Sequence, residues 1–201
     1  MKPIEFSEIK NIIDYEKIRL DFRSRVIDMK KTRRLAVGDH VTLTFENRHT
    51  VTFQIEEMMR VERIVEDAKI KSEVDTYNEL IPRDNELSAT LFVEVNEQSR
   101  IKPVLDSLVG MNKDSVFLKI GENMIPAVFE EGHATDDRIS AVQYVRFKLT
   151  PEQTEAMADQ SVGIQVVIRH RNYKAEAVLP PAMRKALYSD MTEGKSVNVW
   201  A

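Results

Sequence analysis

The spacing of apolar residues changes near residue 85, and this change most constrains the fold. Before it, apolar residues recur mainly every three or four positions, which is typical of amphipathic helices. After it, short segments alternate apolar and polar residues, as strands do. The proline and the Asp-Asn pair in "IPRDN" mark an internal boundary at residues 84–86. We therefore predict an α+β fold, with a helix-rich region containing one strand over residues 1–84, packed on a mainly antiparallel sheet region over residues 85–201, in one compact unit.

The N-terminal region is predicted to contain a long helix, one half-buried strand and a second long helix. The strand covers the alternating segment "VGDHVTLTFEN". The second helix is expected to be capped by Thr50 and to run to about Asp67. The inner side of the first helix is expected to carry Tyr15, Ile18, Phe22, Val26 and Met29.

Residues 86–130 and 140–180 both show the order strand, helix, strand, strand. We expect these two units to share one antiparallel sheet with helices on one face. The helix of the second unit has a clear start, because Thr150 and Gln153 match a capping box. The sheet region is thus predicted to consist of two similar units.

Composition excludes several classes of function. The chain has no cysteine, which rules out disulfides, thiol nucleophiles and thiolate ligands for zinc or iron–sulfur clusters. The net charge of -4, with charges of both signs interspersed, favours neither nucleic acid nor a membrane surface as a partner. No segment approaches the roughly 18 consecutive apolar residues of a membrane span, and the first residues lack a signal-peptide core. We expect a cytoplasmic protein.

The histidines indicate no metal site. His40, His49, His133 and His170 are widely separated, and Gly132 argues against a helix that would place Glu130 and His133 together. A turn at "RN" would place His170 opposite Tyr173 as a hydrogen-bonding pair. We predict no metal or other cofactor, and metal binding through His133 or His170 with carboxylates remains an alternative that elemental analysis can check.

Two polar residues lie inside the apolar arc of the second long helix. On a helical wheel over residues 51–68, Gln54 and Glu62 fall within the arc of Val51, Ile55, Met58, Val61 and Val65. The opposite side carries Glu56, Arg60, Arg63 and Asp67. A buried carboxylate without a donor is costly, so Glu62 should meet an arginine. The candidate donors are Arg25, Arg33 and Arg48.

This arrangement has three interpretations. A buried ion pair could fix the register of two helices. Alternatively, Arg48, Gln54 and Glu62 could be the polar groups of a small-ligand pocket at the turn between residues 46 and 54. A protein-binding face is the third interpretation.

Several motifs resemble those of a bacterial family of proteins of unknown function. They are "YEKIR", "FR-RVI", "FENR-TV-FQI-EM-RVERI", "DTYNELIP", "ATLFVEV" and "Y-AEA-LP", and the similarity runs from about residue 8 to residue 190. The resemblance implies no established activity. It implies a context, because such proteins are often encoded beside a rubrerythrin-like di-iron protein and an iron–sulfur oxidoreductase with cysteine-rich CCG domains. The matching positions give the candidate binding site as Asn47, Arg48, Gln54, Glu57, Arg60, Glu62, Asp75, Tyr77 and Asn78.

These observations favour a non-catalytic accessory or partner protein of a bacterial redox or oxidative-stress system. A chain without cysteine cannot carry electrons on its own thiols or clusters. No nucleophile elbow, phosphate loop or dinucleotide fingerprint occurs in the sequence. The alternative is a small-molecule-binding protein or an enzyme that uses Arg48, Gln54 and Glu62, so the sequence leaves open whether the chain is an enzyme.

Overall fold

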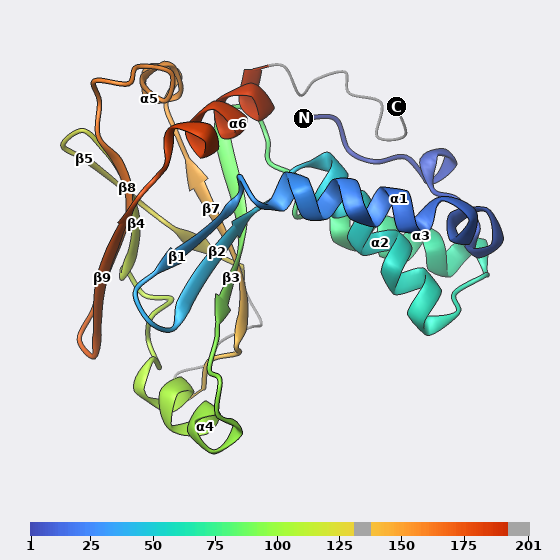
Figure 1. The fold of residues 1–201 in the computed structure, drawn as a ribbon, viewed down its shortest axis with the longest axis horizontal. Helices are drawn as coiled ribbons and strands as arrows, with labels where there is room; N and C mark the ends of the chain where they lie inside the picture. Colours follow the sequence, from blue (N-terminus) through green and yellow to red (C-terminus); the bar gives the residue numbers. More distant parts are fainter. Residues whose placement is uncertain (131–137, 193–201) are drawn as a thin grey trace.

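The computed structural model describes residues 1–130 and 138–192, which form two antiparallel sheets and a group of N-terminal helices (Figure 1). The predicted α+β class is confirmed. A short 3₁₀ turn, η1 (Phe6–Glu8), precedes the long helices. The helices are α1 (Ile12–Lys30), α2 (Arg48–Glu62) and α3 (Asp67–Asn78).

The larger sheet has five strands in the order β1-β2-β3-β7-β6, with antiparallel neighbours. The predicted single strand near residues 37–46 is instead a hairpin of β1 and β2. Gly38 turns the chain between them, with a φ of 74° that glycine adopts readily. All five residues of β2 are buried, so this strand is not half-exposed as predicted. The strands are β1 (Arg34–Val37), β2 (Val41–Phe45), β3 (Glu86–Val93), β7 (Val142–Lys148) and β6 (Val128–Phe129).

The second sheet has four strands in the order β5-β4-β8-β9, also antiparallel. Its strands are β5 (Asn123–Pro126), β4 (Val116–Ile120), β8 (Ile164–His170) and β9 (Tyr173–Val178). His170 lies opposite Tyr173 in the β8–β9 register, which confirms the two-residue turn predicted between them.

The two strand–helix–strand–strand units are confirmed in the order of their elements. The first is β3, α4 (Gln98–Ser107), β4 and β5, and the second is β7, α5 (Pro151–Ala156), β8 and β9. The expectation of one shared sheet is wrong, because each unit places its first strand in one sheet and its last two strands in the other. Strand β3 pairs with β7, and β4 pairs with β8, so the two units meet in both sheets.

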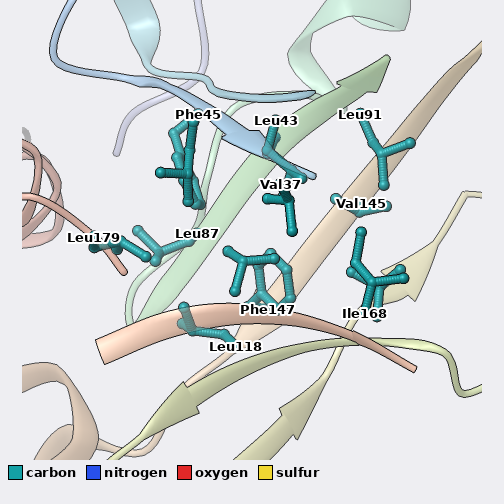
Figure 2. Close-up of a cluster of buried hydrophobic side chains, with 14 of the residues drawn as sticks. Val37, Leu43, Phe45, Leu87, Leu91, Leu118, Val145, Phe147, Ile168 and Leu179 are labelled. Carbon is teal, nitrogen blue, oxygen red and sulfur yellow. The ribbon is translucent and has the colours of Figure 1, made fainter. Parts of the chain in front are cut away.

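The inward-facing side chains of both sheets form the main core (Figure 2). Alternate residues of a strand point to one face, so each strand contributes every second side chain. The last described helix, α6 (Pro181–Thr192), adds Met183 and Leu187 to this core. The residues labelled in Figure 2 are Val37, Leu43, Phe45, Leu87, Leu91, Leu118, Val145, Phe147, Ile168 and Leu179.

Helix α2 contacts both α1 and α3, and each contact has its own apolar cluster. The cluster shared with α1 contains Tyr15, Phe22 and Val26, with Phe53 packed against them. The cluster shared with α3 also takes in a residue of the N-terminal segment, Ile4. Its buried members are Ile4, Val51, Ile55, Met59, Ile70, Val74, Leu80 and Ile81.

The β1–β2 turn should tolerate no side chain at Gly38. A left-handed residue other than glycine costs about 1–2 kcal/mol, and an added Cβ would lie 2.5 Å from Tyr173 Oη and 2.8 Å from Ala175 Cβ. We expect Gly38→Ala to lower the free energy of unfolding by about 3 kcal/mol, measured by urea denaturation.

Gly110→Ala is the matched control, because Gly110 has a φ of 88° but no atom within 4 Å of the added Cβ. Its free energy of unfolding should fall only by the conformational cost of a left-handed residue, about 1–2 kcal/mol. Equal losses in the two variants would show that contact with Tyr173 does not constrain the turn.

Candidate functional site

Helix α2 carries most of the candidate site residues, so its ends decide which way they point. The side chain of Asn47 accepts from the Thr50 N–H (3.0 Å), and the Asn47 N–H donates to Thr50 Oγ1 (2.9 Å). This capping box begins the helix at Arg48, ahead of the predicted Thr50 cap. At the other end, Arg63 has a left-handed φ of 55°, which ends the helix at Glu62 rather than near residue 67.

The predicted orientation of α2 is only partly right: Val51 and Ile55 are buried as expected, but the helix is covered on two sides rather than one. Its buried apolar line is Val51, Ile55 and Met59, which faces the cluster shared with α3. Val61 and Val65, which the wheel placed inside, are both exposed. A helical wheel that assumes a single buried side therefore places that side at the wrong rotation about the helix axis.

The acid on the buried side is Glu56 and not Glu62. Glu62 is exposed and Gln54 is half-buried, whereas Glu56 is only 1% exposed. The expected pairing of Glu62 with an arginine is wrong in each case: Arg33 pairs with Asp190 and Arg48 with Glu8, while Arg25 lies over the Phe22 ring at 5.8 Å. An ion pair between the two long helices nevertheless occurs, between Arg19 and Glu57.

Glu57 is the carboxylate that joins α1 to α2. It accepts hydrogen bonds from Tyr15 Oη (2.7 Å), Arg19 Nε (2.7 Å) and Arg60 (3.3 Å). Partial burial alone would raise the pKa of Glu57, but the hydrogen bonds from Arg19 and Tyr15 outweigh it and lower the pKa to about 2. Burial and the bond to Glu57 raise the pKa of the Tyr15 hydroxyl. Two candidate site residues, Glu57 and Arg60, thus belong to a structural network.

Glu56 lies next to Glu57 in sequence but has a different environment. One carboxyl oxygen accepts from the Lys10 N–H at 2.8 Å, and the other has no hydrogen-bond partner among the described residues. Burial raises the pKa of Glu56 to about 7, although the contact with Lys10 opposes the rise. This carboxyl therefore takes up or releases a proton near neutral pH.

Three candidate site residues gather around the N-terminal segment. Arg48 donates to the carbonyl oxygens of Lys2 (3.1 Å) and Pro3 (3.2 Å). The side-chain amide of Asn78 donates to the Ile4 carbonyl (2.9 Å) and accepts from the Ile4 N–H (2.8 Å). Tyr77 packs against the apolar cluster that buries Ile4. The structure thus brings Arg48, Tyr77 and Asn78 together.

The remaining candidates lie elsewhere. Asp75 and Glu62 are exposed, and Gln54 is half-buried on α2. Arg48 and Glu62 are fourteen residues apart on one helix, a separation of about 21 Å along its axis. The structure does not bring Arg48, Gln54 and Glu62 into one cluster.

Asn47 lies at the junction between the helices and the sheet. Its amide nitrogen donates to Asp190 Oδ1 (3.3 Å), which also accepts from Arg33 (3.1 Å). Burial raises the pKa of Asp190 against the lowering effect of Arg33. Sequence reasoning missed Asp190, because 157 residues separate it from Arg33 and no local pattern marks the pair.

Three hollows on the described part of the chain lie away from the candidate residues. One of about 530 Å³ is bordered by α4 and Ile139, and another of about 380 Å³ lies between Met157 and α6. A third adjoins His170, whose Nε2 lies 3.1 Å from the Val109 carbonyl oxygen, in a structural contact. Over residues 1–130 and 138–192 no group of histidine and carboxylate side chains could hold a metal ion. His133 lies outside the described residues.

Helix α1 has an exposed apolar stripe that sequence reasoning overlooked. Ile13, Leu20 and Ile27 are 74%, 74% and 45% exposed. They are seven residues apart, and the signal is a repeat in the sequence: Ile-Asp-Tyr, Leu-Asp-Phe and Ile-Asp-Met begin at these positions. In each triplet the first residue points outward and the third inward. We call Ile13, Leu20 and Ile27 the α1 stripe.

Stability should depend on the Glu56 proton. The folded chain keeps this proton up to a pKa of about 7, whereas the ordinary value is 4.5, so between these values the folded state binds more protons and stability falls as pH rises. We expect the free energy of unfolding to fall by about 3 kcal/mol across this window, measured by urea denaturation at a series of pH values. Glu56→Gln should abolish this decline.

The control is Glu62→Gln, the same chemical change on an exposed residue of the same helix. It should keep the pH dependence of the unmodified chain. Persistence of the full decline in Glu56→Gln would assign the titration to another group.

Comparison with known proteins agrees with the resemblance seen in the motifs. Among the described residues, none of the helices is both long and apolar enough to cross a membrane. No curated protein matches the chain. A crystal structure of a protein of unknown function from Burkholderia pseudomallei K96243 is similar, with a TM-score of 0.87 and 28% identity over 94% of this chain and 100% of that chain. The pattern of a family described as "Protein of unknown function (DUF3501)" matches residues 3–191, and the chain belongs to this family.

Proposed function

We propose that this chain is a non-catalytic partner protein of a bacterial redox or oxidative-stress system, and that it docks through the outer face of α1. The observation that carries the proposal is the α1 stripe, three large apolar side chains exposed along one side of a helix. Isolated exposed apolar residues are ordinary, but a regular row of them is a surface that another protein can cover.

The spacing of the stripe suits a partner helix. Seven residues make almost two helical turns, so Ile13, Leu20 and Ile27 lie nearly on one line along α1. A helix lying along that line covers all three, as helices do in coiled coils. Burial of one such side chain contributes about 1.5–3 kcal/mol, and this gain opposes the entropic cost of association.

The edge of the stripe adds a preference of charge. Asp14, Asp21 and Asp28 each directly follow a residue of the stripe, and Lys17 and Lys31 pair with Asp14 and Asp28 at 2.7 Å. Such exposed pairs are weak, so lysine or arginine along the facing edge of a partner helix would meet Asp21 directly and exchange with Lys17 and Lys31 at the other two acids.

The resemblance to the family points to the partner. The expected neighbour is a rubrerythrin-like di-iron protein, and di-iron carboxylate proteins of the ferritin-like type are helical bundles. Their outer helices are surfaces of the kind that the α1 stripe fits. The second expected partner is the iron–sulfur oxidoreductase with CCG domains, and in such a system the electrons travel on the partners, because this chain has no cysteine.

The contacts of the candidate polar residues support a non-catalytic role. Glu57 and Arg60 hold α1 on α2, Asn47 caps α2 and contacts α6, and Asn78 binds the backbone of Ile4. Each of these side chains has a structural partner, so none is held ready for a substrate by the contacts described.

Replacing the middle residue of the stripe should break the interaction. A charge at position 20 would have to be desolvated at the interface, which is costly. From native cells, we expect the tagged chain to recover the di-iron protein or the iron–sulfur oxidoreductase, identified by mass spectrometry, and Leu20→Glu to lower that recovery at least about tenfold.

Val178→Glu is the matched control, because Val178 is 66% exposed and lies on β9, far from α1 in the sequence. It should recover partners as well as the unmodified chain does. Recovery of neither protein by the unmodified chain would contradict the proposed partners, and normal recovery by a folded Leu20→Glu variant would contradict the proposed surface.

A further inference from the structure

The chain's own N-terminal residues are bound to α2 and α3 as a peptide is bound to a receptor. Residues 1–5 form neither helix nor strand, and η1 follows them before α1 begins (Figure 1, dark blue). We call residues 2–8 the strap, and the surface of α2 and α3 that it contacts the strap site. The strap site contacts both the backbone and the side chains of the strap.

Side chains of the strap site bind the backbone of the strap. The amide of Asn78 forms two hydrogen bonds to Ile4, one with its N–H (2.8 Å) and one with its carbonyl (2.9 Å). An amide side chain can do this because it carries both a donor and an acceptor. Arg48 donates to the carbonyls of Lys2 and Pro3. Such contacts require an extended backbone and are indifferent to the side chains it carries.

Two side chains of the strap supply selectivity. Ile4 is 3% exposed, enclosed by apolar residues of α2, α3 and the segment after α3. Glu8 forms an ion pair with Arg48, a guanidinium that is itself almost wholly buried at 7% exposure. A segment that replaced the strap would therefore need an aliphatic residue and, four residues later, an acid.

We infer that the strap site is a peptide-binding surface, which the chain fills in cis and which accepts in trans a segment of a partner protein that is extended as far as an aliphatic residue and then turns, as η1 does, to bring a carboxylate four positions later to Arg48. The charge of the partner segment is set by Arg48, whose buried guanidinium loses two carbonyls and a carboxylate when the strap leaves. This inference does not depend on the α1 stripe, which lies on the outer face of α1.

The cis arrangement makes the strap a competitor. A segment joined to its own site by a short connection has an effective concentration in the millimolar range, so a partner segment must compete against it. The connection here is residues 9–11, between η1 and α1, where Ile9 and Asn11 both have extended backbone conformations. Loosening the strap should therefore expose the site and raise its apparent affinity for an added segment.

The test uses a fluorescently labelled peptide of residues 2–9, "KPIEFSEI", titrated with the full chain and followed by fluorescence anisotropy. The chain variant Ile4→Ala weakens the strap and leaves the strap site intact. We expect this variant to bind the peptide at least about tenfold more tightly than the unmodified chain does. The peptide that carries alanine in place of its isoleucine should bind at least about tenfold more weakly than the normal peptide.

Asn78→Ala, added to the Ile4→Ala chain, should lower peptide affinity by about tenfold, because it removes the pair of backbone hydrogen bonds. Circular dichroism and thermal melting establish that each variant is folded. If Ile4→Ala does not fold, Glu8→Lys loosens the strap instead, since the Glu8 side chain is 35% exposed.

Equal peptide affinity in the unmodified and loosened chains, or binding that ignores the isoleucine, would overturn the inference. A second copy of the chain is the other possible occupant. If a loosened, folded chain fails to bind the peptide, while the unmodified chain forms a dimer in sedimentation experiments that Ile4→Ala abolishes, the site serves exchange of straps between copies and the partner-peptide inference is wrong.

Discussion

One hydrogen-bonded carboxylate, Glu57, fixes the position of α1 on α2 together with the apolar cluster of Tyr15, Phe22 and Val26. It accepts from Tyr15 and Arg19 of α1 and from Arg60 of its own helix, and these donors lower its pKa to about 2 against the effect of burial. Helix α1 leads through a short turn into β1, and α2 begins directly after β2. The geometry of this helix pair therefore also sets how the β1–β2 hairpin enters the larger sheet, and with it the position of the core strands that pair with β2.

Local patterns predicted the individual helices and strands of this fold well. They predicted poorly how these elements are arranged in the two sheets. The strand patterns after residue 85, the capping box at Thr150 and the turn between β8 and β9 are short-range signals, and the structure confirms each of them, although β3 is buried on both faces. Pairing of β3 with β7 joins residues fifty or more positions apart, and nothing in the sequence of either strand identifies its partner. That is why two similar units were correctly foreseen while their division between two sheets was not.

The candidate site residues show the same difference between local patterns and long-range arrangement. Motif resemblance gathered nine residues, and three of them, Arg48, Tyr77 and Asn78, do lie around one segment of the chain. The helical wheel failed for Glu62 because it assumes one buried side, whereas α2 lies against both α1 and α3. Glu56 was assigned to solvent for the same reason. Asp190 carried no local signal at all, since its partners Arg33 and Asn47 come from the other end of the sequence.

Helix α6 is bound near both of its ends by charged side chains. Near its start, the buried guanidinium of Arg184 donates to the carbonyls of Ala156, Met157, Asp159 and Val162, and near its end Asp190 holds Arg33 and Asn47. During synthesis on the ribosome, residues 33 and 47 emerge long before residue 190 does. The junction between helices and sheet can thus acquire its final contacts only when translation of the described chain is nearly complete, and until then the N-terminal helices must persist without that brace.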